Sequence, residues 1–364
     1  METKKLIDCC EFISDGDHLP PPKSDSGVPF ITISNITGQN KLSFEDTMFV
    51  PESYYNGLNE NKKAKKDDIL YSVVGSFGKP VYVDFDKQMV FQRHIAILRP
   101  KRNVNARFIY YTMLNPQFYK LVDKLAIGCS QRTVTLDTLR NIEISLPDKD
   151  IQDKTVEVLS LIDRKIDENC KINDNLTAMA YDIYMHSFFS KKPNAKLKDI
   201  LVEADKSSVQ VGEAKQSTGE YPFFTSGSAI LKWDTPFIDG RNCFLNTGGN
   251  ADVKFYVGEA AYSTDTWCIS ANNMSDYLYL LLVSIKPELN QKFFQGTGLK
   301  HLQKPLLKDR PIYIPDFEEL KTFNEQVTPM FNIISENTRE NQELITLRDW
   351  LLPMLMNGQA TISD

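Results

Sequence analysis

The spacing of apolar residues along the chain predicts two long helices. Residues 148–190 contain no glycine and no proline, and apolar or asparagine side chains recur there every seven residues. The same spacing returns over 316–356. The positions are Ile162, Asn169, Leu176 and Ile183 in the first helix, and Met330, Asn337, Leu344 and Leu351 in the second. A helix from about Asp150 to Phe188 would be roughly 57 Å long, so we expect the two helices to pack as an antiparallel pair.

Asparagines lie on the apolar seam of both predicted helices, at Asn169, Asn173, Asn337 and Asn341. An asparagine that faces an aliphatic residue leaves its amide unpaired, so buried asparagines fix the register of a helix pair at a cost in stability. We interpret the pair as a rod of defined length. The alternative is a pair of surface helices whose asparagines face water. Pro329 predicts a kink or a later start for the second helix.

The rest of the chain is rich in short runs of β-forming residues separated by turn residues. Runs typical of strands occupy 28–33, 69–74, 81–85 and 94–98, and a helix is predicted over 108–125. This pattern divides the chain into a first mixed domain (1–147), a long helix (148–190), a second mixed domain (191–315) and a second long helix with a tail (316–364). The predicted fold class is α+β, with two mixed α/β domains separated by a coiled-coil-like helix pair.

One segment of the sequence occurs twice, at an offset of 168 residues and without a gap. When 128–176 is laid over 296–344, eleven of the 49 aligned pairs are identical, where average residue usage gives about three. Gly128 falls on Gly296 and Pro147 on Pro315, whereas the preceding strand regions of the two domains differ strongly. A repeat of this length indicates two similar structural units with an internal pseudo-two-fold. Such a chain suits a two-fold related partner, of which duplex DNA is the commonest.

The distribution of charge is compatible with local DNA binding. The net charge of the chain is −6, but 148–190 carries −4 (nine acidic and five basic residues) and 316–349 carries −5 (eight and three). Everything outside these helical segments therefore sums to +3. No apolar run approaches the roughly 20 residues that span a bilayer. The six scattered cysteines are typical of buried free thiols in a reducing compartment. We expect a cytoplasmic protein that does not enter a membrane.

Motifs that carry catalysis are missing from the sequence. The four histidines have no metal-ligand spacing, and no nucleophile elbow, P-loop or dinucleotide-binding fingerprint is present. Residues 115–118 (Asn-Pro-Gln-Phe) differ from the Asn-Pro-Pro-Phe/Tyr motif of adenine methyltransferases by one residue, and they are interpreted as a helical turn. We expect no catalytic residue and no metal site in this chain.

The order of the segments resembles that of a known family. Each long helix is entered through a similar tetrapeptide, Ile144-Ser145-Leu146-Pro147 or Ile312-Tyr313-Ile314-Pro315, and the chain closes with a characteristic run over 347–359. These features resemble the specificity subunit of Type I restriction–modification systems. The resemblance implies two target-recognition domains, each reading one half of a split sequence in double-stranded DNA. It also implies that the helix pair acts as a ruler that holds the half-sites near one helical turn apart, roughly 34 Å.

The resemblance also implies partners and the places of cofactors. Two methyltransferase subunits would dock on the helices, and motor-nuclease (restriction) subunits would join them. No cofactor would be bound by this chain: S-adenosylmethionine would lie on the methyltransferase subunits, and ATP and Mg on the motor-nuclease. Two other functions stay open, a stand-alone DNA methyltransferase with its own recognition domains and a duplicated scaffold that binds proteins alone.

Candidate DNA contacts follow from the different chemistry of phosphates and base edges. Phosphates are bound by lysine and arginine, and base edges by polar side chains on exposed loops. The candidates in the first domain are Lys62, Lys63, Lys65 and Lys66 for phosphates, Gln131, Arg132 and Thr133 for base edges, and the loop of Gly75-Ser76-Phe77-Gly78-Lys79. In the second domain they are Asn246, Thr247 and Asn250, together with Lys300 and His301 at the positions that follow Gly296.

Overall fold

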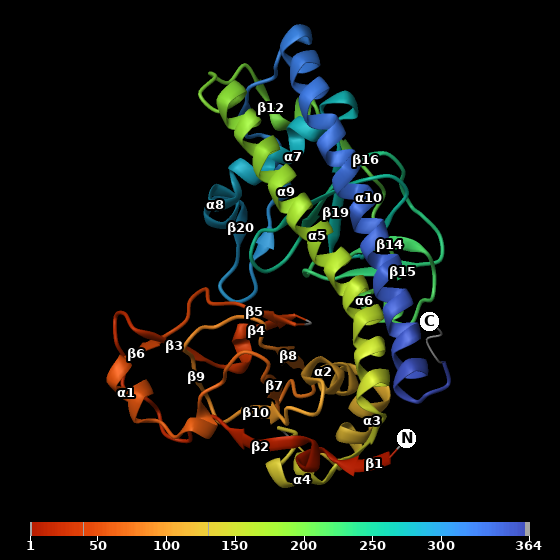
Figure 1. The fold of residues 1–364 in the computed structure, drawn as a ribbon. Helices are drawn as coiled ribbons and strands as arrows, with labels where there is room; N and C mark the ends of the chain where they lie inside the picture. The colour runs from red at the N-terminus through yellow and green to blue at the C-terminus, as the bar shows by residue number, and fades with distance from the viewer. Residues whose placement is uncertain (1, 39, 130, 361–364) are drawn as a thin grey trace. The chain divides into compact units, whose positions relative to one another are not determined.

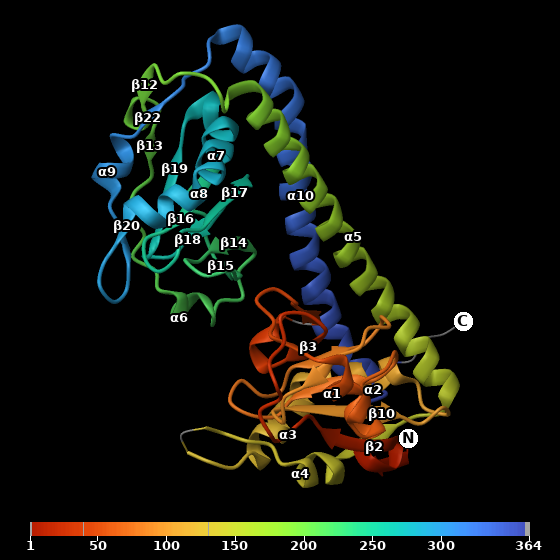
Figure 2. The ribbon, with the colours of Figure 1, turned by 90° about the vertical axis from the view of Figure 1, so that its left-hand side faces the viewer.

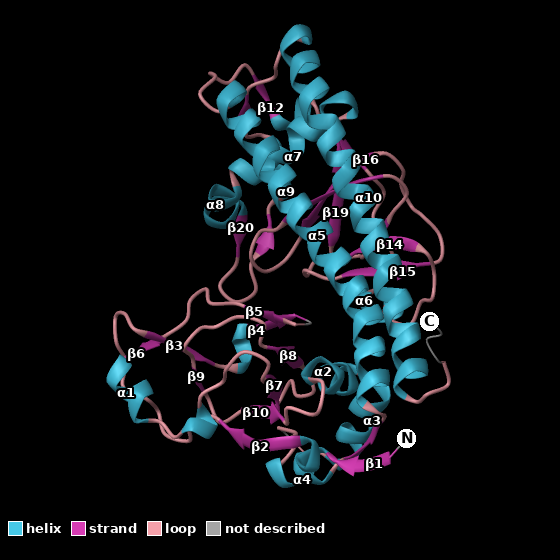
Figure 3. Cartoon of the chain, in the orientation of Figure 1, coloured by secondary structure: helices cyan, strands magenta, loops and turns pink. Residues whose placement is uncertain are grey.

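The computed structural model describes residues 2–38, 40–129 and 131–360. The last four residues of the predicted C-terminal tail lie outside this range. The chain forms two compact units, which we call the N-terminal unit (Met1–Arg164 with Leu344–Asp364) and the central unit (Lys165–Glu343). Figure 1 gives the element labels, and Figure 3 shows that strands and helices are mixed throughout.

The N-terminal unit is built on two small sheets whose strands are mostly antiparallel. A four-stranded sheet has the order β2-β10-β7-β8, with bounds Cys10–Asp15, Ile95–Pro100, Ile69–Ser72 and Pro80–Tyr82. A second sheet has the order β6-β3-β9, with bounds Phe49–Val50, Val28–Ile31 and Val90–Phe91. Two small pairs complete it, β1 with β11 (Glu2–Lys5, Glu143–Leu146) and β4 with β5 (Ile36–Gly38, Lys41–Leu42). The strand runs predicted from the sequence therefore overlap β3, β7, β8 and β10, although only two residues of the run 81–85 lie in β8.

The helices of this unit correct one prediction. They are α1 (Glu52–Gly57), α2 (Ala106–Leu114), α3 (Pro116–Leu125) and α4 (Leu136–Asn141). The single helix expected over 108–125 is broken at Asn115, because Pro116 cannot donate a backbone hydrogen bond and disfavours helical backbone in the residue before it. Asn115 caps the new helix by accepting a 2.9 Å hydrogen bond from the amide of Gln117. The resulting core joins Phe108 and Tyr111 to residues of both long helices, such as Leu159 and Leu352.

The central unit repeats this architecture. Its four-stranded sheet has the order β13-β19-β16-β17, with bounds Val202–Glu203, Thr266–Ser270, Arg241–Asn246 and Val253–Val257. Its second sheet has the order β15-β14-β18 (Ile230–Trp233, Tyr221–Phe224, Ala261–Tyr262). The small pairs are β12 with β22 (Ala195–Lys196, Pro311–Ile312) and β20 with β21 (Phe294–Gln295, His301–Leu302). Short helices α6 (Val211–Ala214), α7 (Ser275–Ser284), α8 (Lys286–Glu288) and α9 (Lys304–Lys308) connect them.

The two units share a topology that extends beyond the repeated sequence. β2, β10, β7 and β8 correspond in order and direction to β13, β19, β16 and β17. The second sheets agree in a less common feature, because β3 pairs in parallel with β9 as β14 does with β18. The predicted duplication is therefore present in the fold even where the two sequences have diverged.

Both long helices span 40 residues, α5 from Lys149 to Phe188 and α10 from Phe317 to Met356. A capping box starts α10: the Asp316 carboxylate accepts from the amide of Glu319 at 2.9 Å, and the Glu319 carboxylate accepts from the amide of Asp316 at 3.1 Å. Pro329 lies inside α10 and does not delay its start.

The seam asparagines bond one another in the central unit, where α5 and α10 lie side by side (Figures 1 and 2). Asn169 donates to the side-chain oxygen of Asn341 at 2.9 Å, and Asn337 donates to that of Asn173 at 2.8 Å. Ascending numbers in α5 meet descending numbers in α10, so the helices are antiparallel. The two bonds are equivalent in the repeat, because Asn337 lies 168 residues after Asn169 and Asn341 lies 168 residues after Asn173. Asn169 is only 1% exposed, which excludes the alternative in which it faces water.

Candidate nucleic-acid interface

Two loops predicted as separate candidates meet in the N-terminal unit. The first follows Ser72 at the end of β7 and leads to β8, over 73–79. The second is a hairpin loop between Ile127 and Thr133, whose backbones exchange hydrogen bonds of 2.9 and 2.8 Å. The amide of Gly75 donates to the carbonyl of Arg132 at 2.9 Å, which fastens one loop to the other. We call these two loops the N-terminal loop pair.

The central unit builds the same arrangement from different residues. The loop over 247–252 leads from β16 to β17, and the hairpin loop over 296–300 joins β20 to β21. The amide of Gly249 donates to the carbonyl of Lys300 at 2.9 Å, the equivalent of the bond between Gly75 and Arg132. We call these loops the central loop pair. Residues that the sequence singled out separately are therefore brought together in both units.

The repeated glycines set the shape of both hairpin loops. Gly128 and Gly296 have φ angles of +98° and +149°, which side-chain-bearing residues rarely adopt. A Cβ atom would lie 2.7 Å from the carbonyl oxygen of Gln131 in the first loop and 2.6 Å from that of Leu299 in the second. The same close approach occurs three residues after each glycine. Glycine is therefore required at both positions, and the identity seen in the sequence has a steric cause.

A buried polar side chain closes the first loop of each pair. The Ser72 hydroxyl, which is fully buried, donates to the carbonyl of Ser76 and accepts from the amide of Lys79, both at 3.0 Å. Asn246 stands at the equivalent end of β16 and is also buried. Its amide donates to the carbonyls of Gly248 (2.7 Å) and Asn250 (2.6 Å), and its oxygen accepts from the amide of Asp252 at 2.7 Å.

This geometry corrects one predicted DNA contact and adds a residue that the sequence did not reveal. Asn246 was predicted as a DNA contact, but its side-chain amide and oxygen form these hydrogen bonds within its own loop, so it is not available to a ligand. Ser72 has the same role and carried no signal in the sequence beyond its place at the end of a predicted strand.

The remaining loop candidates differ in exposure. Ser76, Lys79, Gln131, Asn250, Lys300 and His301 are all exposed. Arg132 is half-buried: its guanidinium bonds both the carboxylate and the carbonyl of Asp123 and lies 5.6 Å from the ring of Phe77. Thr133 and Thr247 are half-buried, and the Thr247 hydroxyl donates to the carbonyl of Asp265 at 3.0 Å. The exposed set is the part of each loop pair that is available to a ligand.

The predicted lysine run is largely engaged with carboxylates. Lys62 pairs with Asp17 at 3.3 Å, and Lys65 pairs with Glu60 at 3.0 Å. Lys63 is buried, and its ammonium bonds Glu60 at 3.0 Å and the carbonyl of Asn56 at 3.4 Å. Because a phosphate contact would require Lys63 to leave these partners, the prediction that Lys63 binds phosphate is wrong. Lys62, Lys65 and the exposed Lys66 stay predictions.

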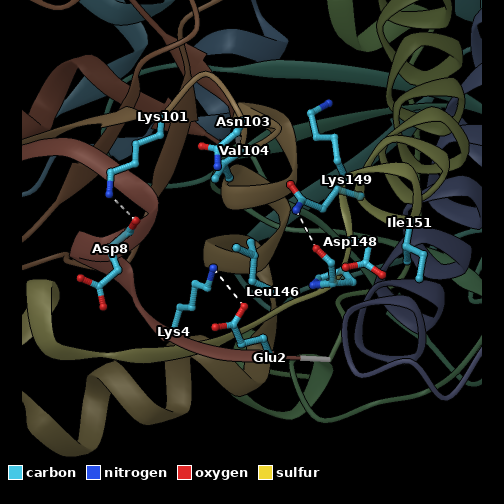
Figure 4. A pocket seen from close by; sticks show the side chains of 12 residues that line it. Glu2, Lys4, Asp8, Lys101, Asn103, Val104, Leu146, Asp148, Lys149 and Ile151 are labelled. Carbon is cyan, nitrogen blue, oxygen red and sulfur yellow. Dashed lines mark hydrogen bonds and ion pairs between the residues drawn. The ribbon is translucent and has the colours of Figure 1, made fainter.

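Charged groups around a pocket of the N-terminal unit are also paired. This pocket of about 460 Å³ lies beside β1 and the start of α5 (Figure 4). Lys4 pairs with Glu2 at 3.0 Å, Lys101 donates to the carbonyl of Asp8 at 2.7 Å, and Lys149 pairs with a carboxylate one turn further along α5. Its cations are thus neutralised locally, and the pocket offers less to a phosphate backbone than the exposed loops do.

Over residues 2–38, 40–129 and 131–360, no group of three or more histidine, cysteine or acidic side chains is placed to hold a metal. Within the same ranges, no helix is long and apolar enough to cross a membrane. All six cysteines are free, and Cys9, Cys10, Cys243 and Cys268 are buried. Burial raises the pKa of the Cys10 and Cys268 thiols to about 12, so both are protonated at neutral pH. Cys129 is exposed, contrary to the prediction that the thiols are buried.

Comparison with known proteins places the chain in a family. The sequence model of the Type I restriction modification DNA specificity domain matches it twice, over residues 1–178 and 191–346. The chain belongs to this family. Two curated members are similar to it: the specificity subunit of the Type I restriction enzyme HindI of Haemophilus influenzae is 26% identical, with 82% of this chain and 87% of that protein covered. The MjaIX specificity subunit of Methanocaldococcus jannaschii is 21% identical, with 73% and 71% covered.

A solved structure of the same family has a similar fold. The S subunit of a Type I restriction–modification system from M. genitalium superposes with a TM-score of 0.58 and 15% identity, covering 100% of this chain and 96% of that one. The first match to the specificity-domain family ends within α5, and the second ends within α10. Each copy of the family's domain thus contains one mixed α/β region and most of the long helix that follows it.

Proposed function

We propose that this member of the specificity-subunit family is a non-catalytic DNA-recognition subunit in which each loop pair reads one half of a bipartite target. The observation that carries this proposal is that one loop framework is built twice, with different exposed side chains. The N-terminal loop pair presents Ser76, Lys79 and Gln131, and the central loop pair presents Asn250, Lys300 and His301. Two different half-sites require the same loop arrangement with different exposed side chains.

The chemistry of these side chains fits duplex DNA. Lysine contributes attraction to phosphates that does not depend on sequence. Glutamine and asparagine can bond adenine through two hydrogen bonds, and lysine can bond the acceptors of guanine in the major groove. Each loop pair contains both kinds of group, so each can position a half-site and discriminate among bases.

The long helices suit the other expected roles. In the N-terminal unit they expose Leu161, Leu347 and Trp350, and in the central unit Ile172, Met179 and Ile333. Apolar side chains on helices with a net negative charge favour a protein partner over phosphates. We propose that two methyltransferase subunits dock on these helices and that motor-nuclease subunits join that complex in the cytoplasm. S-adenosylmethionine would be bound by the methyltransferase subunits, and ATP and Mg by the motor-nuclease.

Methylation mapping tests the proposal directly. The chain is expressed with its methyltransferase partner in a host that lacks other methylation, and the methylated motif is read by sequencing. We expect a bipartite motif with a fixed spacer. Gln131→Ala should relax the first half-site only, and Asn250→Ala the second half-site only. A complex that binds random DNA as well as any bipartite sequence would refute the proposal and leave the scaffold function. Binding of S-adenosylmethionine by the isolated chain would instead support the stand-alone methyltransferase.

A further inference from the structure

A third loop joins the loop pair in each unit, and the sequence did not single it out. In the N-terminal unit it is the turn over 92–94 that leads into β10, where the carbonyl of His94 accepts from the amide of Val73 at 2.9 Å. In the central unit it is the turn over 263–265 before β19, where the carbonyl of Asp265 accepts from the amide of Thr247 at 3.0 Å. Each turn is therefore bonded to the first loop of its loop pair.

Strand pairing explains why these turns reach the same edge of the sheet. β10 runs antiparallel to β7 with Ile95 opposite Ser72, so β10 begins where β7 ends. β19 runs antiparallel to β16 with Thr266 opposite Asn246, which produces the same juxtaposition. The residues before Ile95 and Thr266 are thus equivalent, although their offset in the sequence is 171 and not 168.

The two turns carry charged side chains of opposite sign. Arg93 and Asp265 are both exposed, and neither belongs to an ion pair within the described part of the chain. The Arg93 amide donates to the carbonyl of Asp17 at 3.0 Å, and its Nε donates to Nε2 of His94 at 3.4 Å. Burial, followed by the charge of Arg93, lowers the pKa of His94, so the turn has one positive charge at neutral pH.

We propose that this third loop supplies a specificity-determining side chain to each half-site, Arg93 for a guanine and Asp265 for a cytosine. The inference rests on the proposed function, because it assumes that the loop pairs face DNA. A planar guanidinium can bond O6 and N7 of guanine together, whereas a carboxylate can accept from the amino group of cytosine. A carboxylate near DNA is repelled by phosphates, so a base amino group is the favourable partner for it at this edge.

One consequence is that the two half-sites differ at the position that this loop reads. At that position the N-terminal unit selects guanine, a purine, through the donors of Arg93. The central unit selects cytosine, a pyrimidine, through the acceptor oxygens of Asp265. The chain would therefore bind an asymmetric target in one orientation despite its repeated fold.

The test compares four variants in the intact complex with the methyltransferase partner. Arg93→Ala and Asp265→Ala remove the proposed contacts. Arg102→Ala and Glu259→Ala are the matched controls, because both residues are exposed and lie at the opposite edge of the same sheets, beyond the end of β10 and of β17. Binding is measured against a panel of duplexes that carry each base at every position of the motif, and thermal melting checks that all variants fold.

Arg93→Ala should lower discrimination at one base pair of the first half-site by about 5- to 150-fold, and Asp265→Ala should do so at one base pair of the second. The controls should leave the panel unchanged. A uniform loss of affinity with Arg93→Ala, with a shallower salt dependence, would assign Arg93 to a phosphate and overturn its part of the inference. A uniform gain with Asp265→Ala would mean simple repulsion and overturn the other part. A wild-type complex without any bipartite preference would instead refute the proposed function.

Discussion

The buried ion cluster of the N-terminal unit supports a prediction for which the equivalent site of the central unit serves as an internal control. Arg348 on α10 donates to Asp163 on α5 at 3.0 Å, and the other oxygen of Asp163 accepts from the hydroxyl of Tyr111 at 2.7 Å. The 168-residue offset places Tyr279, Phe331 and Ala180 at the equivalent positions in the central unit. There the rings of Tyr279 and Phe331 meet edge to face at 5.3 Å, and Ala180 is fully buried. The same site is therefore ionic in one unit and apolar in the other.

Removing one charge from this cluster should be costly. Arg348 is only 4% exposed and also pairs with the exposed Asp349 at 2.8 Å, and Arg348→Ala leaves the Asp163 carboxylate with the Tyr111 hydroxyl as its remaining partner in this cluster. Breaking a buried pair in this way costs about 3–5 kcal/mol. Because a quarter of the Asp163 side chain reaches water, we expect the lower end, about 3 kcal/mol. The double variant Asp163→Phe/Arg348→Ala recreates the apolar set of the central unit, and it should lie within about 1 kcal/mol of the wild type.

Native-state hydrogen exchange read by mass spectrometry measures this local stability. Peptides from 149–164 and 344–356 should lose protection in the single variant and regain it in the double variant. Peptides from the central unit are the internal control and should not change. The reasoning is refuted if Arg348→Ala protects α5 as well as the wild type does, or if the double variant is as unstable as the single one.

Three further predictions concern the loops, the seam and pH. Asn246→Ala removes three hydrogen bonds and should lower local stability by about 3 kcal/mol, seen as lost exchange protection over 247–252; unchanged protection would contradict the assigned role. Asn169→Leu removes the donor to the side-chain oxygen of Asn341 and should cost about 1–3 kcal/mol, with the fold intact by circular dichroism but a weaker preference for one half-site spacing; an unchanged spacing preference would count against the ruler. The hydroxyl of Tyr313, followed by a lysine, lowers the pKa of Glu319 from 4.5 to about 2. Its folded-state pKa is depressed, so the start of α10 should be most stable above pH 4.5 and lose protection as the pH falls toward 2; Glu319→Gln should flatten this profile, and an equal profile in both proteins would refute it.

Several parts of the structure follow from local features of the sequence. The periodicity over 148–190 predicts α5 to within one or two residues at each end, because a helix repeats every 3.6 residues whatever surrounds it. The seam asparagines could be recognised because they interrupt an apolar stripe at equivalent places in both repeats. Gly128 and Gly296 could be recognised for a similar reason, since only glycine tolerates the backbone of those loops.

The break at Asn115 shows where a local pattern misleads. Apolar residues continue at helical spacing across Pro116, but the backbone cannot, because proline removes a donor and restricts the residue before it. Covalent geometry outweighed periodicity at that position.

Which polar side chains remain exposed was decided by the tertiary structure. Lys63 and Asn246 have the residue types that bind DNA, yet Glu60 and the β16–β17 loop use their polar atoms. Arg93 and Asp265 carried no motif, and the pairing of β10 with β7 and of β19 with β16 brings them beside the loop pairs. The sequence by itself determined the two helices, the repeat and the family, because these depend on periodicity and on residues near one another in the chain. Only the fold decided which charged and polar side chains bond partners within the protein and which remain exposed, because those partners are brought together by strand pairing and packing.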